Sequence, residues 1–96
     1  MVYTIVFARS AEDDLARLRP FDRTRVTNAI LDNLSYEPFV ETRNRKRLKK
    51  IDENTPPWEL RVGEFRVFYE PGGNGTVTVK VVGVRNKGRK TTGETL

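Results

Sequence analysis

The stretch WELRVGEFRV, residues 58–67, predicts two short strands joined by a tight turn. Apolar and polar side chains alternate on both sides of Gly63 and Glu64, and a two-residue loop with glycine first is typical of a type II′ hairpin. In that register Arg61 lies directly opposite Arg66. Like charges that face each other across a sheet destabilise it by up to about 1 kcal/mol, so this pair needs an explanation.

The composition excludes several classes of active site. The 96 residues form one expected domain over residues 1–90, with residues 91–96 as a flexible tail. The absence of cysteine and histidine excludes disulfides, thiolate metal sites and nucleophiles that depend on a histidine base. We expect neither a metal nor another cofactor. Because no apolar run approaches the roughly 20 residues of a membrane span and no signal peptide is recognised, we expect a soluble cytoplasmic protein.

Charge is unevenly distributed along the chain. Residues 1–41 carry five Lys or Arg and seven Asp or Glu, a net −2, whereas residues 42–96 carry thirteen and six, a net +7. This asymmetry favours a polyanionic partner, and nucleic acid is the first candidate. The alternative is a soluble basic protein without a specific partner.

The first half predicts a strand followed by two amphipathic helices. Residues 2–7 (VYTIVF) alternate as a strand with a buried face. Ser10 opens an S-x-x-D capping box for a first helix that Pro20 ends. Asp22 can cap a second helix, which stops before Pro38. The apolar stripes of the two helices are Ala11, Leu15 and Leu18, then Val26, Ala29, Ile30 and Leu34.

The second half predicts short strands joined by turns. Part of the polar segment near residues 47–51 can form a strand, and residues 71–75 (PGGNG) predict a turn. Three further strands are expected at residues 58–62, 65–69 and 76–84. Short connections make them an antiparallel meander, and the first strand of the chain must join the same sheet. The helices then cover one face, which gives a two-layer α+β fold with the other face partly open.

The open face carries the functional prediction. If the apolar residues of the hairpin face the helices, then Glu59, Arg61, Arg66 and Phe68 face outward. A phosphate would relieve the repulsion between the arginines, because arginine makes bidentate contacts with phosphate. Phe68 offers a ring for base stacking, a common way to hold single-stranded RNA. The alternatives are solvated arginines paired with nearby glutamates, and a phenylalanine covered by a loop or the tail.

A second basic feature is the segment RNRKRLKK, residues 43–50, in which six of eight residues are basic. Such blocks repel themselves and usually bind polyanions or stay solvated. Leu48 and Ile51 favour docking of part of the segment as an edge strand, whose lysines would also deter edge-to-edge aggregation. The candidate RNA contacts are therefore Arg43, Arg45, Lys46, Arg47, Lys49 and Lys50, together with Phe68.

The whole pattern resembles the RelE/ParE superfamily of toxins from type II toxin–antitoxin systems. The resemblance covers residues 2–90 and rests on the β-α-α start, the basic stretch RLKK and the specific stretch WELRVGEFRVFYE. It implies a compact αβ toxin with a cognate antitoxin as partner. RelE-like members cleave mRNA in the ribosomal A site without a metal, through attack of the RNA's own 2′-hydroxyl on the adjacent phosphate. The resemblance therefore also implies the ribosome and mRNA as partners.

The resemblance implies roles for individual residues. Arg61 and Arg66 match basic motif positions, and Arg66 matches the phosphate-stabilising one of cleaving members. A third basic residue, Arg85 or Lys87, follows the last strand, and the basic segment matches a region that grips ribosomal RNA. Glu59 stands where RelE has a lysine. It is either a base, weakened by two neighbouring arginines, or a salt-bridge partner that offsets their positive charge. The catalytic candidates are Arg61, Arg66, Arg85 and Glu59, and Lys87 is a further RNA contact.

The C-terminal sequence keeps other functions open. Cleaving relatives often carry a tyrosine or histidine there, whereas this tail reads KTTGETL. The sequence thus supports phosphate contacts better than it supports a proton-transfer group. The alternatives are a ParE-like inhibitor of DNA gyrase that acts by binding, and a superfamily member with a degenerate site that binds without activity.

Overall fold

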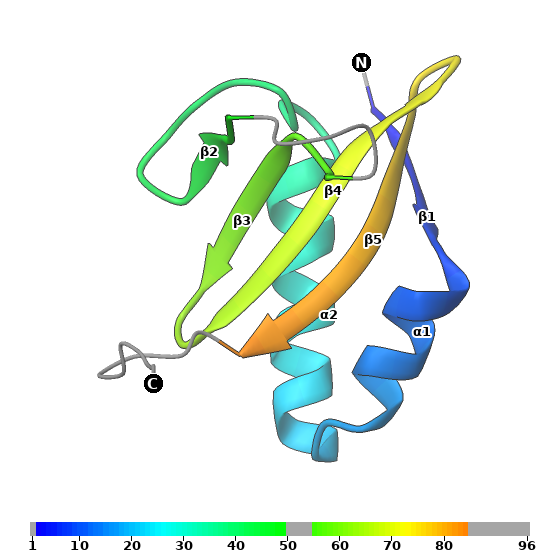
Figure 1. The fold of residues 1–96 in the computed structure, drawn as a ribbon, viewed down its shortest axis with the longest axis vertical. Coiled ribbons are helices and arrows are strands. Elements are labelled where there is room, and N and C mark those ends of the chain that lie inside the picture. The colour runs from blue at the N-terminus through cyan, green and yellow to red at the C-terminus, as the bar shows by residue number, and fades with distance from the viewer. Residues whose placement is uncertain (1, 50–54, 85–96) are drawn as a thin grey trace.

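The computed structural model describes residues 2–49 and 55–84, which form one mixed sheet and two helices. The elements are β1 (Thr4–Phe7), α1 (Arg9–Ala16), α2 (Pro20–Leu34), β2 (Arg45–Arg47), β3 (Trp58–Val62), β4 (Phe65–Gly73) and β5 (Thr76–Val84). The strands lie in the order β1-β5-β4-β3-β2, with β2 to β5 antiparallel and β1 parallel to β5. Both helices lie on one side of the sheet (Figure 1). The predicted two-layer α+β fold is therefore confirmed.

The β3–β4 hairpin has the register that the sequence predicts. Arg61 lies directly opposite Arg66. Gly63 has φ +58°, whereas Glu64 keeps a negative φ, which is the pattern of a type II′ turn. Glycine is needed there because a Cβ atom strains a left-handed backbone. The facing arginines are thus a real feature of the fold.

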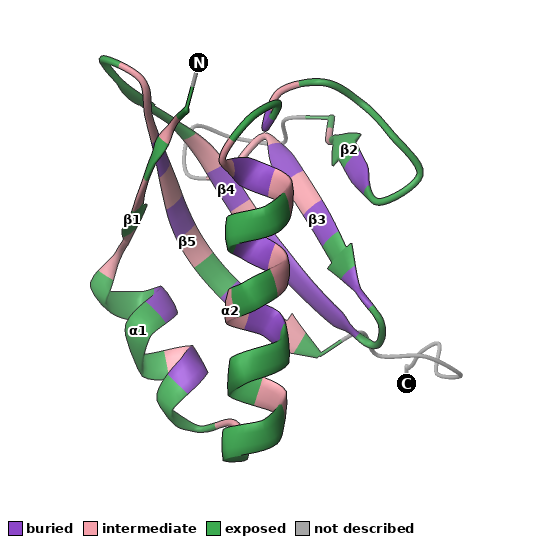
Figure 2. Ribbon diagram, turned by 180° about the vertical axis from the view of Figure 1, so that it is seen from behind, coloured by how far each residue is buried: buried purple, intermediate pink, exposed green. Residues whose placement is uncertain are grey.

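The core lies between the sheet and the helices, as the buried positions in Figure 2 show. Val26, Ile30 and Leu34 of α2 are fully buried, and α1 contributes Ala11 and Leu15, so both predicted helical stripes are confirmed. The sheet contributes Trp58, Leu60, Val62, Phe65, Val67, Tyr69, Val77, Val79 and Val82. The strands bury alternate residues, so the remaining side chains point to the opposite, open face.

The start of α1 differs from the predicted capping box. The helix begins at Arg9, with Ala8 extended at the N-cap and no side-chain cap. The Ser10 hydroxyl instead donates to the carbonyl oxygen of Lys80 in β5, at 2.6 Å. Ser10 therefore makes a tertiary contact with β5 instead of capping the helix as its local sequence pattern predicts.

The start of α2 also differs from the prediction. Pro20 does not end α1, which stops at Ala16, but forms the first turn of α2. A proline fits there because the first helical N–H has no intrahelical partner to lose. Asp22 lies inside that turn and pairs with Arg19 at 3.3 Å rather than capping the helix. Acidic residues in a first turn still favour the helix dipole.

Two strand boundaries move as well. β2 covers Arg45–Arg47, N-terminal to the strand predicted near residues 47–51. β4 continues to Gly73, through Pro71, so the predicted five-residue turn shrinks to the tip at Asn74 and its neighbours. The pairing of β4 with β5 shifts register between Pro71 and Gly73. Such an irregularity accommodates a proline, which cannot donate to the ladder.

The outer edge of β2 is sealed by the chain that precedes it. The Thr42 N–H donates to the carbonyl oxygen of Arg45, and the Arg45 N–H donates to the Thr42 hydroxyl oxygen. A Glu41 carboxylate oxygen accepts the N–H of Arg47 at 3.1 Å. These groups are the ones that another strand would need, so this edge is not available for strand addition.

The outer edge of β1 is open by contrast. Thr4 and Ala8 donate their N–H groups to carbonyl oxygens on the β5 side. Because backbone groups alternate along a strand, the N–H groups of Ile5 and Phe7 point away from β5. Within residues 2–49 and 55–84, no partner accepts a hydrogen bond from either group.

Candidate nucleic-acid interface

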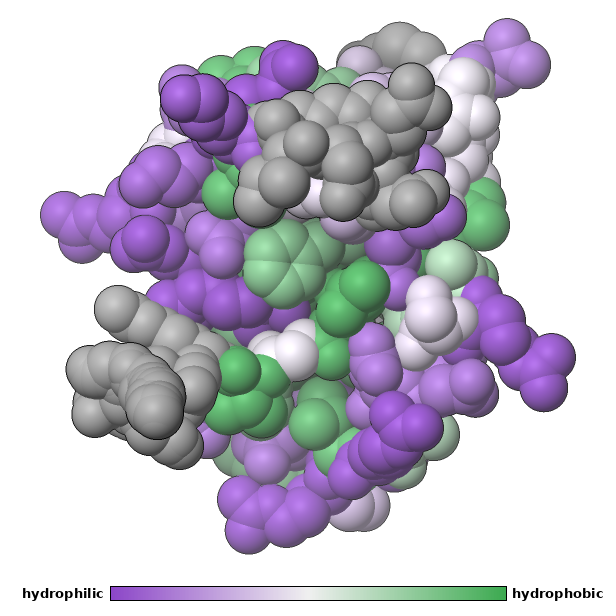
Figure 3. All heavy atoms as spheres, in the orientation of Figure 1, coloured by the Kyte–Doolittle hydropathy of each residue, from purple (hydrophilic) through white to green (hydrophobic). Residues whose placement is uncertain are grey.

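Two rows of side chains cross the open face of the sheet. The first row is Lys46, Glu59, Phe68 and Val81, and the second is Arg61, Arg66 and Gly83. Phe68 is half-buried and Val81 is exposed, so the first row combines charge with apolar surface. Figure 3 views this face and shows apolar atoms at its centre with hydrophilic atoms on both sides. The predicted outward set of the hairpin therefore does share one face.

Glu59 explains how the fold tolerates the facing arginines. One carboxylate oxygen lies 4.0 Å from Nε of Arg61, and the other lies 3.8 Å from Nε of Arg66. The side chains of Glu59 and Arg66 are 15% and 9% exposed, whereas that of Arg61 is 43% exposed. An internal carboxylate thus bridges the pair. Of the two predicted roles for Glu59, the geometry is that of a salt-bridge partner.

Arg66 is less accessible than the sequence suggests. Its Nη1 donates to the carbonyl oxygens of Gly63, at 2.9 Å, and Phe65, at 2.8 Å. These contacts fold the guanidinium back onto the turn of its own hairpin. Arg66 therefore lies on the predicted face of the sheet, but its side chain is buried and stabilises the turn. Arg61 is the exposed cation of the pair.

Arg45 has a structural role instead of the predicted place among exposed cations. It is 9% exposed and lies opposite Leu60, on the helix side of the sheet. Its guanidinium donates to the carbonyl oxygens of Val40, at 3.0 Å, and Asn33, at 2.9 Å. A cation near the C-terminal end of α2 also favours the helix dipole. Arg45 therefore joins the loop to α2, and its guanidinium is not available to RNA.

A basic pocket of 310 Å³ lies at the β2–β3 end of the sheet. Its lining residues are Glu41, Thr42, Arg43, Arg45, Lys46 and Arg61. The pocket brings exposed cations from the loop, from β2 and from β3 to one place, which favours binding of an anion. Sequence reasoning missed Glu41 and Thr42. The Thr42-x-Asn44 spacing, with its side-chain-to-backbone turn, was the available signal.

The other predicted contacts fall into two groups. Arg47 and Lys49 are exposed, and the Arg47 guanidinium lies 5.9 Å from the centre of the Trp58 ring. This cation–π contact holds Arg47 against the sheet. Lys50, Arg85 and Lys87 lie outside the residues that the structure describes.

Tyr69 is the tyrosine nearest to the hairpin motif, but it faces the core. Its hydroxyl donates to the carbonyl oxygen of Pro38. Burial raises the pKa of the Tyr69 hydroxyl far above its usual value, although the nearby Arg45 charge lowers it. A buried neutral phenol on the helix side cannot serve as a proton-transfer group for the open face.

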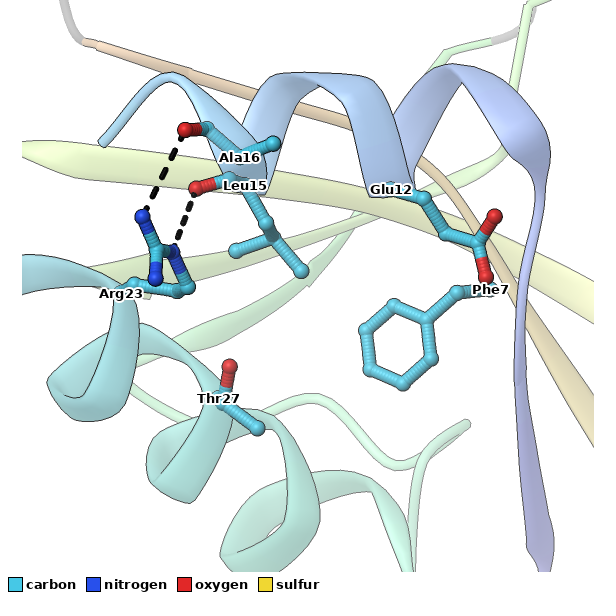
Figure 4. A pocket seen from close by; sticks show the side chains of 6 residues that line it. All are labelled: Phe7, Glu12, Leu15, Ala16, Arg23 and Thr27. Carbon is cyan, nitrogen blue, oxygen red and sulfur yellow. Dashed lines mark hydrogen bonds between the residues drawn. The ribbon is translucent and has the colours of Figure 1, made fainter. Parts of the chain in front are cut away.

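A second hollow, of 490 Å³, lies between the two helices and β1 (Figure 4). It shares no lining residue with the basic pocket. Phe7, Leu15 and Ala16 give it a mainly apolar lining, to which Glu12 and Thr27 add polar groups. Arg23 also lines it, but its guanidinium donates to the carbonyl oxygens of Leu15, at 3.1 Å, and Ala16, at 3.4 Å. Arg23 thus satisfies the C-terminal end of α1, and no predicted site residue lies in this hollow.

The described part of the chain offers no cluster of three or more residues that could hold a metal ion. None of its helices is long and apolar enough to cross a membrane.

The chain is similar to one protein family and to several solved structures. The sequence model for the ParE toxin of type II toxin–antitoxin systems, parDE, matches residues 5–90. A search of curated proteins gave no match. A chain of the RelBE2 toxin–antitoxin complex from Mycobacterium tuberculosis superposes with a TM-score of 0.71 at 29% identity, over 88% of this chain and 100% of that one.

Two archaeal structures show the same fold at lower identity. A chain of the RelE–RelB complex from Pyrococcus horikoshii has a TM-score of 0.69 at 19% identity, over 91% of this chain and 99% of that one. A chain of the RelB–RelE complex from Methanococcus jannaschii has a TM-score of 0.58 at 21% identity, over 82% and 88%. All three relatives come from complexes of a toxin with its antitoxin.

Proposed function

The chain belongs to the ParE toxin family of type II toxin–antitoxin systems, and we propose that it arrests translation by cutting mRNA on cytoplasmic ribosomes, the activity that its resemblance to RelE-like toxins implies. The position of Arg61 carries the proposal. Its exposed guanidinium lines the basic pocket and lies one row from Phe68. A single RNA strand can cross this point with its phosphates at the cations and a base against the ring.

The proposed reaction uses the RNA as its own nucleophile. The 2′-oxygen attacks the adjacent phosphorus, the bond from phosphorus to the 5′-oxygen breaks, and the ends become a cyclic phosphate and a 5′-hydroxyl. The 2′-hydroxyl loses a proton and the departing 5′-oxygen gains one. Negative charge grows on the phosphate oxygens in the transition state, so a cation aimed at them lowers the barrier. Removing one such group typically slows a reaction about 10²–10³-fold.

The test is a map of mRNA ends in cells that express the protein. We expect new 5′-hydroxyl ends within translated messages, and about 10²-fold fewer with Arg61→Ala. Arg9→Ala is the matched control, because it removes the same charge from a side chain that is 88% exposed on α1. If Arg61→Ala cuts as often as Arg9→Ala, the proposed site is wrong.

A second candidate is a gyrase-directed toxin that acts by binding. Two observations favour it: Glu59 offsets the charge of the arginine pair, and Arg66 is tied to backbone carbonyl oxygens. Among residues 2–49 and 55–84, the carboxyl group beside the pair is that of Glu59, and it is engaged in ion pairs with both arginines. Intact mRNA together with DNA damage on expression would favour this candidate over RNA cleavage.

In the described part of the chain, one of the two sheet edges is open to an antitoxin. The outer edge of β2 is sealed, whereas Ile5 and Phe7 present backbone groups at the outer edge of β1. We propose that an extended segment of the antitoxin pairs with β1 and lengthens the sheet, as peptides do in strand addition. The apolar hollow beside Phe7 would accept a side chain of that segment.

A further inference from the structure

The Glu59 carboxylate lies between the guanidinium groups of the two facing arginines. Its two oxygens lie 4.0 Å and 3.8 Å from the Nε atoms of Arg61 and Arg66. Each oxygen faces one guanidinium, as two oxygens of a bound phosphate would. We propose that Glu59 is a built-in competitor of the RNA phosphate, which must release Arg61 before a phosphate can bind there. This inference rests on the proposed RNA-cleaving function.

A third cation completes the surroundings of Glu59. Lys46 lies directly opposite it across the β2–β3 pair, on the same face of the sheet. Lys46, Arg61 and Arg66 thus share this face of the sheet with Glu59, and the four side chains together carry a net charge of +2. The Glu59 side chain is 15% exposed, so salt screens these interactions less than it screens surface pairs.

The competitor gives the site a preference among anions. A single phosphate that displaces Glu59 exchanges one anion for another and gains little. A ribose-phosphate chain also reaches Arg43 and Lys46 in the basic pocket, and each added contact releases counterions. The site therefore selects a single strand that presents several phosphates over a mononucleotide or inorganic phosphate.

The experiment compares two substitutions that change the net charge equally. Glu59→Gln removes the competing charge and keeps the shape of the side chain, whereas Glu64→Gln does the same at the exposed hairpin tip. The probe is a short 2′-O-methyl oligouridine, which cannot be cleaved, titrated at several salt concentrations. We expect Glu59→Gln to bind about tenfold tighter and its salt slope to steepen by about 0.7, the value for one added phosphate contact. Glu64→Gln should bind less than about threefold tighter with an unchanged slope.

A second background separates competition from a structural role. With Arg61→Ala already present, the gain from Glu59→Gln should fall to that of Glu64→Gln, because the two residues act through one contact. Inorganic phosphate should bind all variants weakly. The inference is overturned if Glu59→Gln binds the oligouridine no tighter than Glu64→Gln. If binding does not depend on Arg61 in any background, the proposed RNA site itself fails, and Arg61→Ala alone reveals that result.

Discussion

The two ends of the sheet present opposite surfaces to a partner. At the β2–β3 end the strand edge is sealed by Thr42 and Glu41, and exposed cations surround a pocket. At the β1 end the backbone edge is open, and an apolar hollow lies beside it. The first surface suits a polyanion, whereas the second suits an extended peptide. One small domain therefore offers separate ends to the two partners that we propose, RNA and an extended segment of the antitoxin.

The largest effect should come from proline substitutions in β1. Val6→Pro removes an N–H that faces β5 and leaves a carbonyl oxygen of β5 without its donor, so it should destabilise the fold more than any other substitution described here. Ile5→Pro removes an outward N–H together with a half-buried side chain that packs against the core, so it should cost less stability than Val6→Pro and should weaken antitoxin binding. Urea unfolding and co-purification with the antitoxin measure the two effects. Unchanged antitoxin binding by folded Ile5→Pro would show that β1 is not the docking edge.

Arg45→Ala should have the next largest effect, and on stability. It leaves the carbonyl oxygens of Val40 and Asn33 without their donors, which should lower the free energy of unfolding by about 2–3 kcal/mol. Lys46→Ala, at the exposed neighbouring position, should change it by less than about 0.5 kcal/mol. Urea unfolding of both variants tests the difference. Equal free energies of unfolding for Arg45→Ala and Lys46→Ala would contradict the structural role of Arg45.

Tyr69→Phe should have the smallest effect near neutral pH, about 1 kcal/mol, for the lost hydrogen bond to Pro38. The pKa of Tyr69 is raised in the folded state, so the unfolded chain ionises first. Stability is therefore fully present below pH about 10 and is lost as the pH rises above it. Unfolding curves from pH 8 upward should show this loss in the wild type and a smaller loss in Tyr69→Phe. Parallel curves would contradict it.

The sequence predicted most of what depends on local pattern. The hairpin register followed from the glycine turn and the alternation around Arg61 and Arg66, and the helical stripes followed from their spacing. The cap of the first helix was predicted wrongly because the Ser10 hydroxyl donates to a carbonyl oxygen of β5, 70 residues further along the chain. A local motif carries no information about such a contact.

The predicted exposure of the basic residues was wrong where side-chain direction depended on an edge strand. All three residues of β2 are basic, so no apolar alternation fixes its register, and a shift of one residue reverses every side chain. Arg45 therefore turned toward α2 while Lys46 turned to the open face. The burial of Arg66 could not be predicted either. Its partners are backbone carbonyl oxygens of its own turn, and every residue has such an oxygen, so the residue types in the sequence do not identify them.

The central claim is that the protein cuts ribosome-bound mRNA at the cations around Arg61. Purified ribosomes that carry a defined mRNA test this claim most directly. We predict 5′-hydroxyl ends at the codon in the ribosomal A site, none in the same mRNA without ribosomes, and about 10²-fold slower cutting by Arg61→Ala than by Arg9→Ala. Intact ribosome-bound mRNA, or equal rates for Arg61→Ala and Arg9→Ala, would contradict the claim.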